Sequence, residues 1–240
     1  MPACNLRSQQ SLDAIASWTS DNLMKLNEDK TKYMVFSRSE TEVATRLTLN
    51  GNTINRIEEI KLVGVWITTW LDWDKNTKEI CKKAYARMTM LTKLKYAGVP
   101  REDLITVYIL YIRSLLEYCS VAWHSTLTNE QSNNLESVQK LCLKIILASE
   151  YCGYENALEI CGLDSLSSRR DDNCLKYGLR SLLHPIHSKQ FPLNMKNSSV
   201  DTRKSEHFKV NWAKSESYRM SAIPYIQRML NQHVKNQQSK

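Results

Sequence analysis

The spacing of hydrophobic residues changes near residue 71 and divides the chain into two differently patterned parts. Before that point the apolar residues form one helical pattern, at 11–23, and several short runs typical of strands. These runs lie at 32–36, within 46–57 on either side of Asn50-Gly51, and at 60–68. Asn-Gly between two alternating runs predicts a hairpin, and the nearly all-apolar run at 60–68 predicts a strand buried on both faces.

Beyond residue 71 the apolar residues recur every three or four positions, which predicts a succession of helices. The expected helices cover 74–96, 104–123, a segment opened by Thr128, 154–163 and 165–183. The length and apolar composition of 104–123 predict a helix buried all round. Thr128 and Gln131 have the spacing of a capping box. The helix after this box is expected to point five residues inward: Leu135, Val138, Leu141, Cys142 and Ile145.

Together these patterns predict an α+β protein. Residues 1–70 form a small piece of one helix and antiparallel strands, and residues 71–185 form a mostly helical bundle. Residues 186–240 form a basic tail. Its part 186–216 is polar and poor in pattern, which predicts loop or partial disorder, and "IPYIQRMLN" predicts a short last helix.

Charge is distributed unevenly along the chain. Residues 1–172 hold 21 Lys and Arg against 22 Asp and Glu, whereas residues 173–240 hold 12 against 3. Nearly all of the net charge of +8 therefore lies in the C-terminal quarter. This asymmetry indicates an acidic partner such as nucleic acid, and a soluble basic tail is the alternative interpretation.

Cysteine content and hydropathy indicate the compartment. Seven cysteines, an odd number in a chain of 240 residues, do not suit a disulfide framework, so a reducing compartment is expected, cytoplasmic or nuclear. The first residues lack the apolar stretch of a secretory signal. Because no run of about 18 apolar residues is found, no membrane partner is expected.

The helix expected at 74–96 has two chemically different faces. On a wheel of about 100° per residue, one sector holds the apolar residues Ile80, Ala84, Met88, Leu91 and Leu94. The opposite side holds Lys75, Lys78, Lys82, Lys93, Tyr85, Thr89 and Tyr96. Ammonium groups interleaved with rings suit a phosphate backbone with sugars or bases beside it. A solvated face of a surface helix is the alternative.

Four segments, taken in order, resemble a known family. They are "LDAIASWTSDNLMKLNEDKTKYMVFS", "IKLVGVWITTWLDWDKNTKEICKKAYARMTMLTKL", "LYIRSLLEYCSVAWHSTLTNEQSNNLESVQKLCLKII" and "YRMSAIPYIQRMLN". In this order the chain resembles the C-terminal part of a reverse transcriptase from a non-LTR retrotransposon, over roughly residues 10–231. The resemblance implies that residues 1–70 are the end of the palm. It also implies that the helices from residue 74 onward form a thumb, which grips an RNA template and DNA primer as an RNA–DNA duplex.

The resemblance implies two further sites. Asn22, Met24, Asn27, Lys30 and Thr31 match the segment that closes the palm, which implies that Lys30 lies near the phosphates of the incoming nucleotide. A solvated lysine at a strand entry is the alternative.

The second implied site is the primer grip, the strand under the primer's end. Leu62, Val63, Gly64 and Val65 match this strand, although Leu62-Val63 stands where the family often has Tyr-Leu. Gly64 would allow a close backbone approach, and a strand bulge is the alternative explanation of this glycine.

Catalysis by this family requires carboxylates that hold two Mg²⁺ ions. In the family they lie on an earlier strand and on an aromatic-x-Asp-Asp hairpin, both before the segment that begins at residue 11. No catalytic residue, metal ligand or cofactor is therefore expected in this chain, and Mg²⁺ is expected only for the complete polymerase. The carboxylate pairs present are interpreted as structural: Asp171-Asp172, Asp72 with Asp74, and Glu102-Asp103.

Zinc and phosphate-loop chemistry are not expected either. The residues with zinc-binding side chains are Cys152, Cys161, Cys174, His184 and His187. Their spacing matches no compact zinc finger, and no glycine-rich phosphate loop is present.

Three hypotheses follow. The chain is a C-terminal fragment of an RNA-directed DNA polymerase that retains template–primer binding without catalysis. Alternatively, it is part of an active polymerase whose palm residues lie upstream, with the missing palm and fingers region as a further partner. In the third hypothesis it is a repurposed helical module that binds protein, and salt-dependent binding of nucleic acid separates this case from the others.

Overall fold

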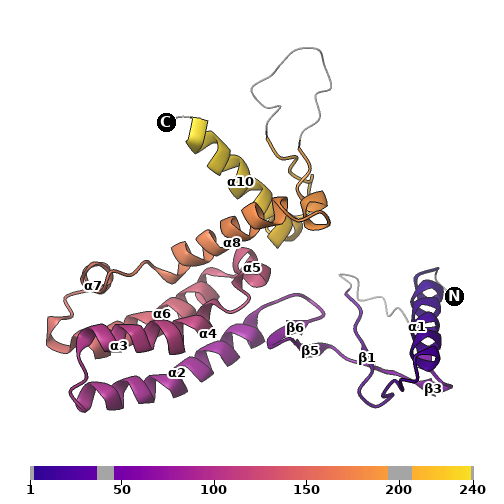
Figure 1. Cartoon of the computed structure of the whole chain (residues 1–240), viewed down its shortest axis with the longest axis horizontal. Coiled ribbons are helices and arrows are strands. Elements are labelled where there is room, and N and C mark those ends of the chain that lie inside the picture. Colours follow the sequence, from indigo (N-terminus) through magenta and orange to yellow (C-terminus); the bar gives the residue numbers. More distant parts are fainter. Residues whose placement is uncertain (1–2, 37–45, 194–206, 239–240) are drawn as a thin grey trace. The chain divides into compact units, whose positions relative to one another are not determined.

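A computed structural model describes residues 3–36, 46–193 and 207–238 (Figure 1). Two compact units are distinguished, Met1–Asp72 and Trp73–Lys240, and each is described by itself. The division falls at Asp72, whereas the sequence predicts it at residue 70. Helices and short strands are both present, so the α+β class is observed.

The first unit contains a helix packed on a hairpin. Helix α1 (Ala3–Asp21) begins earlier than predicted, and its Gln9 amide bonds both backbone groups of Thr48, at 2.8 and 3.0 Å. Strands β2 (Thr48–Leu49) and β3 (Asn52–Thr53) form the hairpin predicted around Asn50-Gly51. The two turn residues have φ of 52° and 84°, as a type I′ turn requires.

A small apolar cluster joins this helix to the hairpin. It consists of Leu47, Leu49 and Ile54, with Leu12, Ala16, Leu26 and Tyr33 packed against them. Strand β1 (Lys32–Tyr33) covers part of the predicted strand 32–36 and pairs with β4 (Asn55–Arg56). This pair is parallel, whereas the sequence predicts antiparallel strands. The link through the β2–β3 hairpin brings β4 back beside β1 in the same direction.

The segment 60–68 is a hairpin and not the single buried strand that the sequence predicts. Strand β5 (Glu59–Leu62) pairs antiparallel with β6 (Val65–Thr68) across a turn of Val63 and Gly64. These turn residues have φ of 48° and 87°. Val65 is buried, but Val63 is 77% exposed. The apolar run predicted a single strand because Val63, a β-branched residue, occupies a turn position where Asn or Asp is usual.

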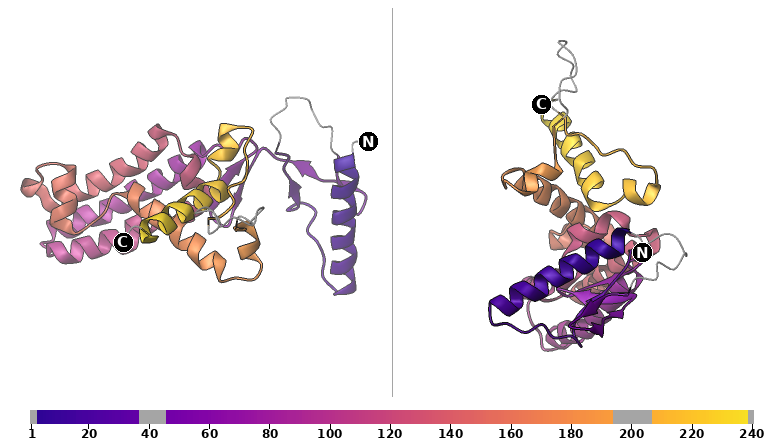
Figure 2. Two further views of the ribbon diagram at one scale, coloured as in Figure 1. Left: turned by 90° about the horizontal axis from the view of Figure 1, so that it is seen from above. Right: turned by 90° about the vertical axis from the view of Figure 1, so that its right-hand side faces the viewer.

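Three helical segments form the bundle of the second unit (Figures 1 and 2). Helices α2 (Asp74–Tyr96) and α6 (Asn129–Leu147) are parallel. Near their N-termini Gln131 Nε2 donates to Asp74 Oδ1 at 2.9 Å, and near their C-termini Lys95 Nζ donates to the Ile146 carbonyl at 2.7 Å. A third segment packs against both: α3 (Arg101–Val107), the π-helical η1 (Tyr108–Arg113) and α4 (Ser114–Glu117).

The bundle encloses the main apolar core. Its fully buried members include Leu91, Leu104, Tyr108, Ile112, Leu116, Trp123, Leu135 and Leu143. Each large aliphatic side chain buried in this way contributes about 1.5–3 kcal/mol through the hydrophobic effect.

The segment 104–123 differs from its prediction in two respects. It is interrupted at Cys119, whose φ is 56°, so that α5 (Ser120–Trp123) is separate from α4. It is also not buried all round, because Leu110 is 70% and Tyr111 43% exposed. Its buried residues recur every four positions, a spacing that drifts by about 40° per repeat in an α-helix. The wider π-helical turn offsets this drift and keeps the row facing the core.

The stretch Arg101–Thr126 is long and apolar enough to cross a membrane by length and composition, although the sequence patterns above predict no such span. This is weak evidence for a membrane span, because the core helix of a soluble protein passes the same test. Here one row of its side chains packs into the bundle core, and the backbone of Cys119 interrupts the helix.

The helices after the bundle's third segment follow the prediction closely. A short 3₁₀ turn, η2 (His124–Thr126), precedes α6, whose capping box is confirmed: Gln131 N donates to Thr128 Oγ1 at 3.2 Å, and Thr128 N to Gln131 Oε1 at 3.0 Å. The expected inward residues Leu135, Val138 and Cys142 are buried, but Leu141 is 40% exposed and Ile145 half-buried. Leu143 and Ile146 take the core positions instead.

Two further helices complete this succession. After the short turn η3 (Ala148–Glu150), α7 (Tyr154–Cys161) ends at Gly162, whose φ is 62°, as predicted. Helix α8 (Leu166–Leu182) is capped by Ser165, whose hydroxyl accepts a hydrogen bond from Ser168 N at 3.2 Å.

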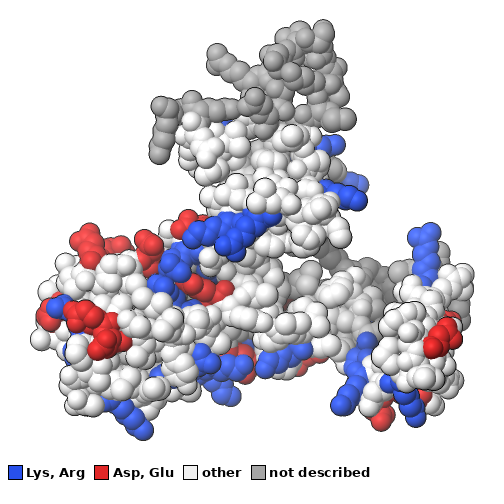
Figure 3. All heavy atoms as spheres, in the orientation of Figure 1, with Lys and Arg blue, Asp and Glu red and all other residues white. Residues whose placement is uncertain are grey.

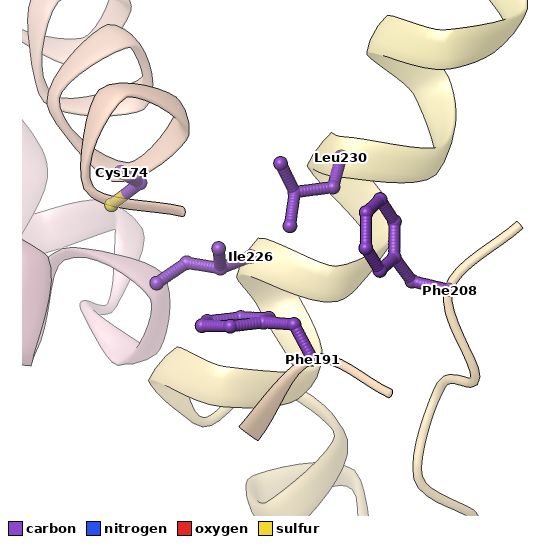
Figure 4. Packing of buried hydrophobic residues seen from close by; sticks show 5 residues of the cluster. All are labelled: Cys174, Phe191, Phe208, Ile226 and Leu230. Carbon is purple, nitrogen blue, oxygen red and sulfur yellow. The ribbon is translucent and has the colours of Figure 1, made fainter. Parts of the chain in front are cut away.

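The described part of the predicted tail packs within the second unit. After η4 (His187–Gln190) and α9 (Glu216–Arg219), the last helix α10 (Ala222–Gln238) has 17 residues and is not short. It packs against α8 over an apolar cluster (Figure 4), made of Cys174, Phe191, Phe208, Ile226 and Leu230. Residues 194–206 of the predicted loop lie outside the described residues.

The Asn231 side chain accepts a hydrogen bond from Phe208 N at 2.7 Å and donates one to Phe208 O at 3.0 Å. Gln227 does the same with Asn211 N, at 3.1 Å, and Gln190 O, at 2.9 Å. The side-chain amides of Asn231 and Gln227 thus hold the segments beside α10 in place. The low apolar content of these segments predicts loop.

Val63→Asn is expected to stabilise the first unit by about 1 kcal/mol, because asparagine tolerates the left-handed region that strains valine. Hydrogen exchange of the β5–β6 amides measures this effect as slower opening. Leu62→Asn, at the neighbouring exposed position outside the turn, is the control and should give no such slowing. Equal or faster exchange in Val63→Asn would contradict the assigned turn.

Gly178→Ala is expected to loosen the packing of α10 on α8. A Cβ at Gly178 would lie 2.6 Å from Ile226 Cγ2, and Ile226 is fully buried. Alanine stabilises a helix by about 1 kcal/mol relative to glycine. The substitution therefore loosens the packing only if the clash with Ile226 costs more than this gain in helix propensity. Faster hydrogen exchange along α10 is the expected result, with Ser181→Ala, also buried on α8, as the control. Unchanged or slower exchange in Gly178→Ala would show that α10 does not pack here.

Candidate nucleic-acid interface

Helix α2 carries most of the predicted site. It spans Asp74–Tyr96, the range that the sequence predicts. Its ends suit the helix dipole, because Asp74 lies in the first turn and Lys93 and Lys95 lie in the last. On this helix, side chains three or four residues apart share a side.

The two faces of α2 differ in exposure much as the wheel predicts. Ile80, Ala84 and Leu91 are buried, and Met88 and Leu94 are half-buried. The opposite side exposes Lys78, Lys82, Lys93, Tyr85, Thr89 and Tyr96. Lys75 differs from this group because it is half-buried and already has an interaction partner. In Figure 3, Lys and Arg side chains gather along the edge of the bundle where α2 lies.

The exposed lysines of α2 differ in whether they form an ion pair within the chain. Lys78 Nζ lies 3.1 Å from Asp74 Oδ2, and the lysine side chain is 76% exposed, so the pair contributes little and a competing anion can open it. Hydrogen bonds from Gln131 and from Lys78 hold the pKa of Asp74 below its usual range, and the carboxylate stays charged. Lys82 and Lys93 form no ion pair with any residue that the structure describes.

Two tyrosines accompany these lysines. Tyr85 is 43% exposed, and its hydroxyl lies 3.4 Å from Ser137 Oγ on α6, which steadies the ring across the two helices. Tyr96, at the end of α2, is 87% exposed. Tyr85 thus offers a held ring near Lys82, whereas the Tyr96 ring lies almost wholly in solvent.

The other predicted sites lie in the first unit. Leu62, Val63, Gly64 and Val65 form the turn of the β5–β6 hairpin and its flanks, so the expected continuous primer-grip strand is not observed. Lys30 is exposed in a turn after α1, where its backbone N–H donates to Asn27 Oδ1 at 2.9 Å. This position agrees with both the phosphate site and the solvated lysine that the sequence leaves open.

A second basic row lies on α8 and is absent from the sequence-based predictions. Arg169, Lys176 and Arg180 are spaced at i, i+7 and i+11, which places them on one side of the helix. Lys and Arg side chains form a band over α8 in Figure 3. Lys176 and Arg180 are exposed, while Glu117 pairs with Arg169 through both guanidinium nitrogens Nε and Nη2. The spacing itself was the signal that could have found this row.

Asp72 and Asp74 form hydrogen bonds, and Glu102 and Asp103 lie at a helix start. Asp72 Oδ2 accepts a hydrogen bond from Thr68 Oγ1 at 2.8 Å at the end of the hairpin, and Asp74 holds Gln131. Glu102 and Asp103 lie in the first turn of α3. Each of these acids therefore has a local role at the start of a helix or beside it.

Asp171 belongs to a polar cluster between α8, α10 and the turn η2. Its Oδ1 accepts from His124 Nε2 at 2.9 Å and from the Tyr225 hydroxyl. Arg170, which is fully buried, donates from Nε to His124 Nδ1 at 3.1 Å. Because arginine can only donate, His124 carries its proton on Nε2 and both ring nitrogens are engaged. The cluster joins three elements and leaves no ring nitrogen for a substrate.

Metal ligands are not brought together in the described ranges. No group of at least 3 His, Cys, Asp or Glu side chains there is placed to hold an ion. The candidate zinc ligands Cys152, Cys161, Cys174, His184 and His187 all lie within these ranges and do not form such a group.

Comparison with protein-family models, with curated proteins and with solved structures finds no match for this chain. The geometry of α2 and its neighbours is therefore the observation on which a function can be argued.

Asp171→Asn is expected to reduce stability at neutral pH and to reduce it less in acid. Burial raises the pKa of Asp171, but the hydrogen bonds from His124 and Tyr225 together outweigh it, so the net shift is downward. A lowered pKa in the folded state stabilises the protein above the unfolded-state value of about 4, and this stabilisation disappears as pH falls through the folded-state value. Urea denaturation at neutral and acid pH measures the difference. A pH-independent difference from wild type would contradict it.

Proposed function

We propose that the chain binds nucleic acid through the exposed basic face of α2, as the thumb of a polymerase does. The observation that carries the proposal is the separation of the two sides of this helix. Lys78, Lys82 and Lys93 are exposed on one side, while the opposite side is buried in the bundle. A fixed row of ammonium groups on a rigid helix binds phosphates by releasing their counterions.

The ligand class follows from the chemistry of this face. Ammonium groups contact phosphates without regard to base sequence, and aromatic rings beside them can lie against sugars or bases. Tyr85 lies three residues after Lys82 on the exposed side of α2. The face therefore suits a nucleic-acid strand better than an acidic protein, because an acidic protein has no base or sugar to lie against the Tyr85 ring.

The origin of the chain is part of the same proposal. The four ordered segments that resemble the end of the palm and the thumb of a non-LTR retrotransposon reverse transcriptase support it. The partners would be an RNA template and a DNA primer, in the cytoplasm or the nucleus. No catalytic role is assigned to residues of this chain.

Lys78→Glu with Lys82→Glu is expected to weaken binding to an RNA–DNA duplex by at least tenfold at low salt. The salt slope should also fall by about one for each phosphate that the protein no longer neutralises. Filter binding across a salt series measures both quantities. Circular dichroism checks folding, which should be unchanged because both side chains are exposed.

The matched control is Lys140→Glu with Lys144→Glu, a lysine pair with the same spacing on α6. These lysines lie over the rings of Tyr154 and Tyr151, 4.9 and 5.4 Å from the ring centroids. The control makes the same change in net charge on α6 and leaves the lysines of α2 in place, so it should retain most of the affinity. An equal decrease in affinity in both variants would show that net charge, and not the position of the lysines on α2, determines binding. A wild-type chain that binds without a salt slope would favour the protein-binding module.

A further inference from the structure

A groove runs between α2 and α6 beside the basic face. Its volume is about 460 Å³, within the range of about 300–1,000 Å³ typical of small-molecule sites. The residues that line it are Thr77, Lys78, Cys81, Lys82 and Tyr85 of α2 and Asn134 of α6.

The groove is fixed by contacts at both ends. At one end Gln131 Nε2 bonds Asp74 Oδ1 at 2.9 Å, and at the other Tyr85 OH lies 3.4 Å from Ser137 Oγ. Thr77 is buried and its hydroxyl donates to the Trp73 carbonyl at 2.8 Å. The parallel helices therefore hold the groove open without movement of either helix.

The groove has three kinds of chemistry along its sides. Its floor is nearly neutral, because Cys81 is buried and burial raises the pKa of its thiol. Lys78 and Lys82 provide positive charge on the side of α2, and the Tyr85 ring lies on the same side. On the other side, α6 contributes the exposed amide of Asn134, which can both donate and accept hydrogen bonds.

We propose that this groove binds one unpaired nucleotide of a strand that lies along α2. Its phosphate would contact Lys78 and Lys82, its base would lie against Tyr85, and Asn134 would meet a polar edge of the base. A nucleotide is the ligand that uses all three features together: an anion, a flat ring and hydrogen-bonding edges. The inference rests on the proposed function, because the strand must first bind along α2.

The experiment compares two forms of one RNA–DNA duplex, blunt and with a short single-stranded tail. Fluorescence anisotropy measures binding of each to the full chain. Wild type should bind the tailed duplex about tenfold more tightly, the scale of one base stacked on an aromatic ring. Asn134→Phe fills the groove without a change in charge, so it should lose this preference and keep its affinity for the blunt duplex.

Asn133→Phe is the matched control, since Asn133 is the neighbouring exposed asparagine on α6 and does not line the groove. It should retain the preference for the tail. A wild-type chain that binds both duplexes equally, or an Asn134→Phe chain that keeps the preference, would overturn the inference and leave the proposed function intact. Failure of wild type to bind either duplex in a salt-dependent manner would refute the proposed function itself.

Millimolar adenosine monophosphate separates a nucleotide within a strand from a free one. It is expected to leave the preference for the tail unchanged. Binding of this nucleotide to wild type but not to Asn134→Phe would overturn the assignment to a strand in favour of a free nucleotide.

Discussion

The parallel packing of α2 on α6 is the constraint on which the rest of the second unit depends. Gln131 holds Asp74 at one end of this pair, and Lys95 holds the Ile146 carbonyl at the other. These two contacts, together with the buried apolar side of α2, set which side of the helix faces solvent. Its lysines at 78, 82 and 93 are therefore exposed because the buried side is already used by α6 and by the helix from Arg101. The proposed interface and the groove beside it are both consequences of this packing.

The C-terminal part of the unit is organised by polar side chains as much as by apolar ones. Helix α10 packs on α8 through Ile226 and Leu230, at the point where Gly178 has no Cβ. Asp171, His124 and Tyr225 connect the same two helices to the bundle. A buried charge such as Arg170 is costly unless it is hydrogen-bonded, and His124 of η2 and Ser132 of α6 accept hydrogen bonds from its Nε and Nη2. Its Nη1 is buried without a hydrogen-bond partner among the described residues. These bonds specify how the elements dock, which apolar contacts alone do less well.

The helices could be predicted from the sequence because their signals are local. The capping box at Thr128, the end of α7 at Gly162 and the extent of α2 all depend on residues close together in the chain. The hairpin at Val63-Gly64 could not be predicted, because valine is rare in a turn of this type and hides it. The π-helical turn after α3 could not be predicted for a different reason. It keeps buried residues that recur every four positions facing the core, and the position of the core depends on the packing of other helices.

For the candidate site, the periodicity of α2 predicted which lysines would share a side. Periodicity could not predict that Lys78 pairs with Asp74, that Lys75 is half-buried, or that Asn134 of α6 lines the same groove as Lys82. Those facts depend on how far one helix is shifted along another, which the sequence of either helix does not state. The basic row on α8 could have been predicted from the sequence by the same helical periodicity that predicted the basic face of α2.

The most direct test of the central claim is lysine acetylation footprinting with and without an RNA–DNA duplex, read by mass spectrometry. If α2 presents the binding face, Lys78, Lys82 and Lys93 become protected on binding, while Lys140 and Lys144 of α6 react as before. Protection spread evenly over all lysines, or confined to Lys140 and Lys144, would contradict the account.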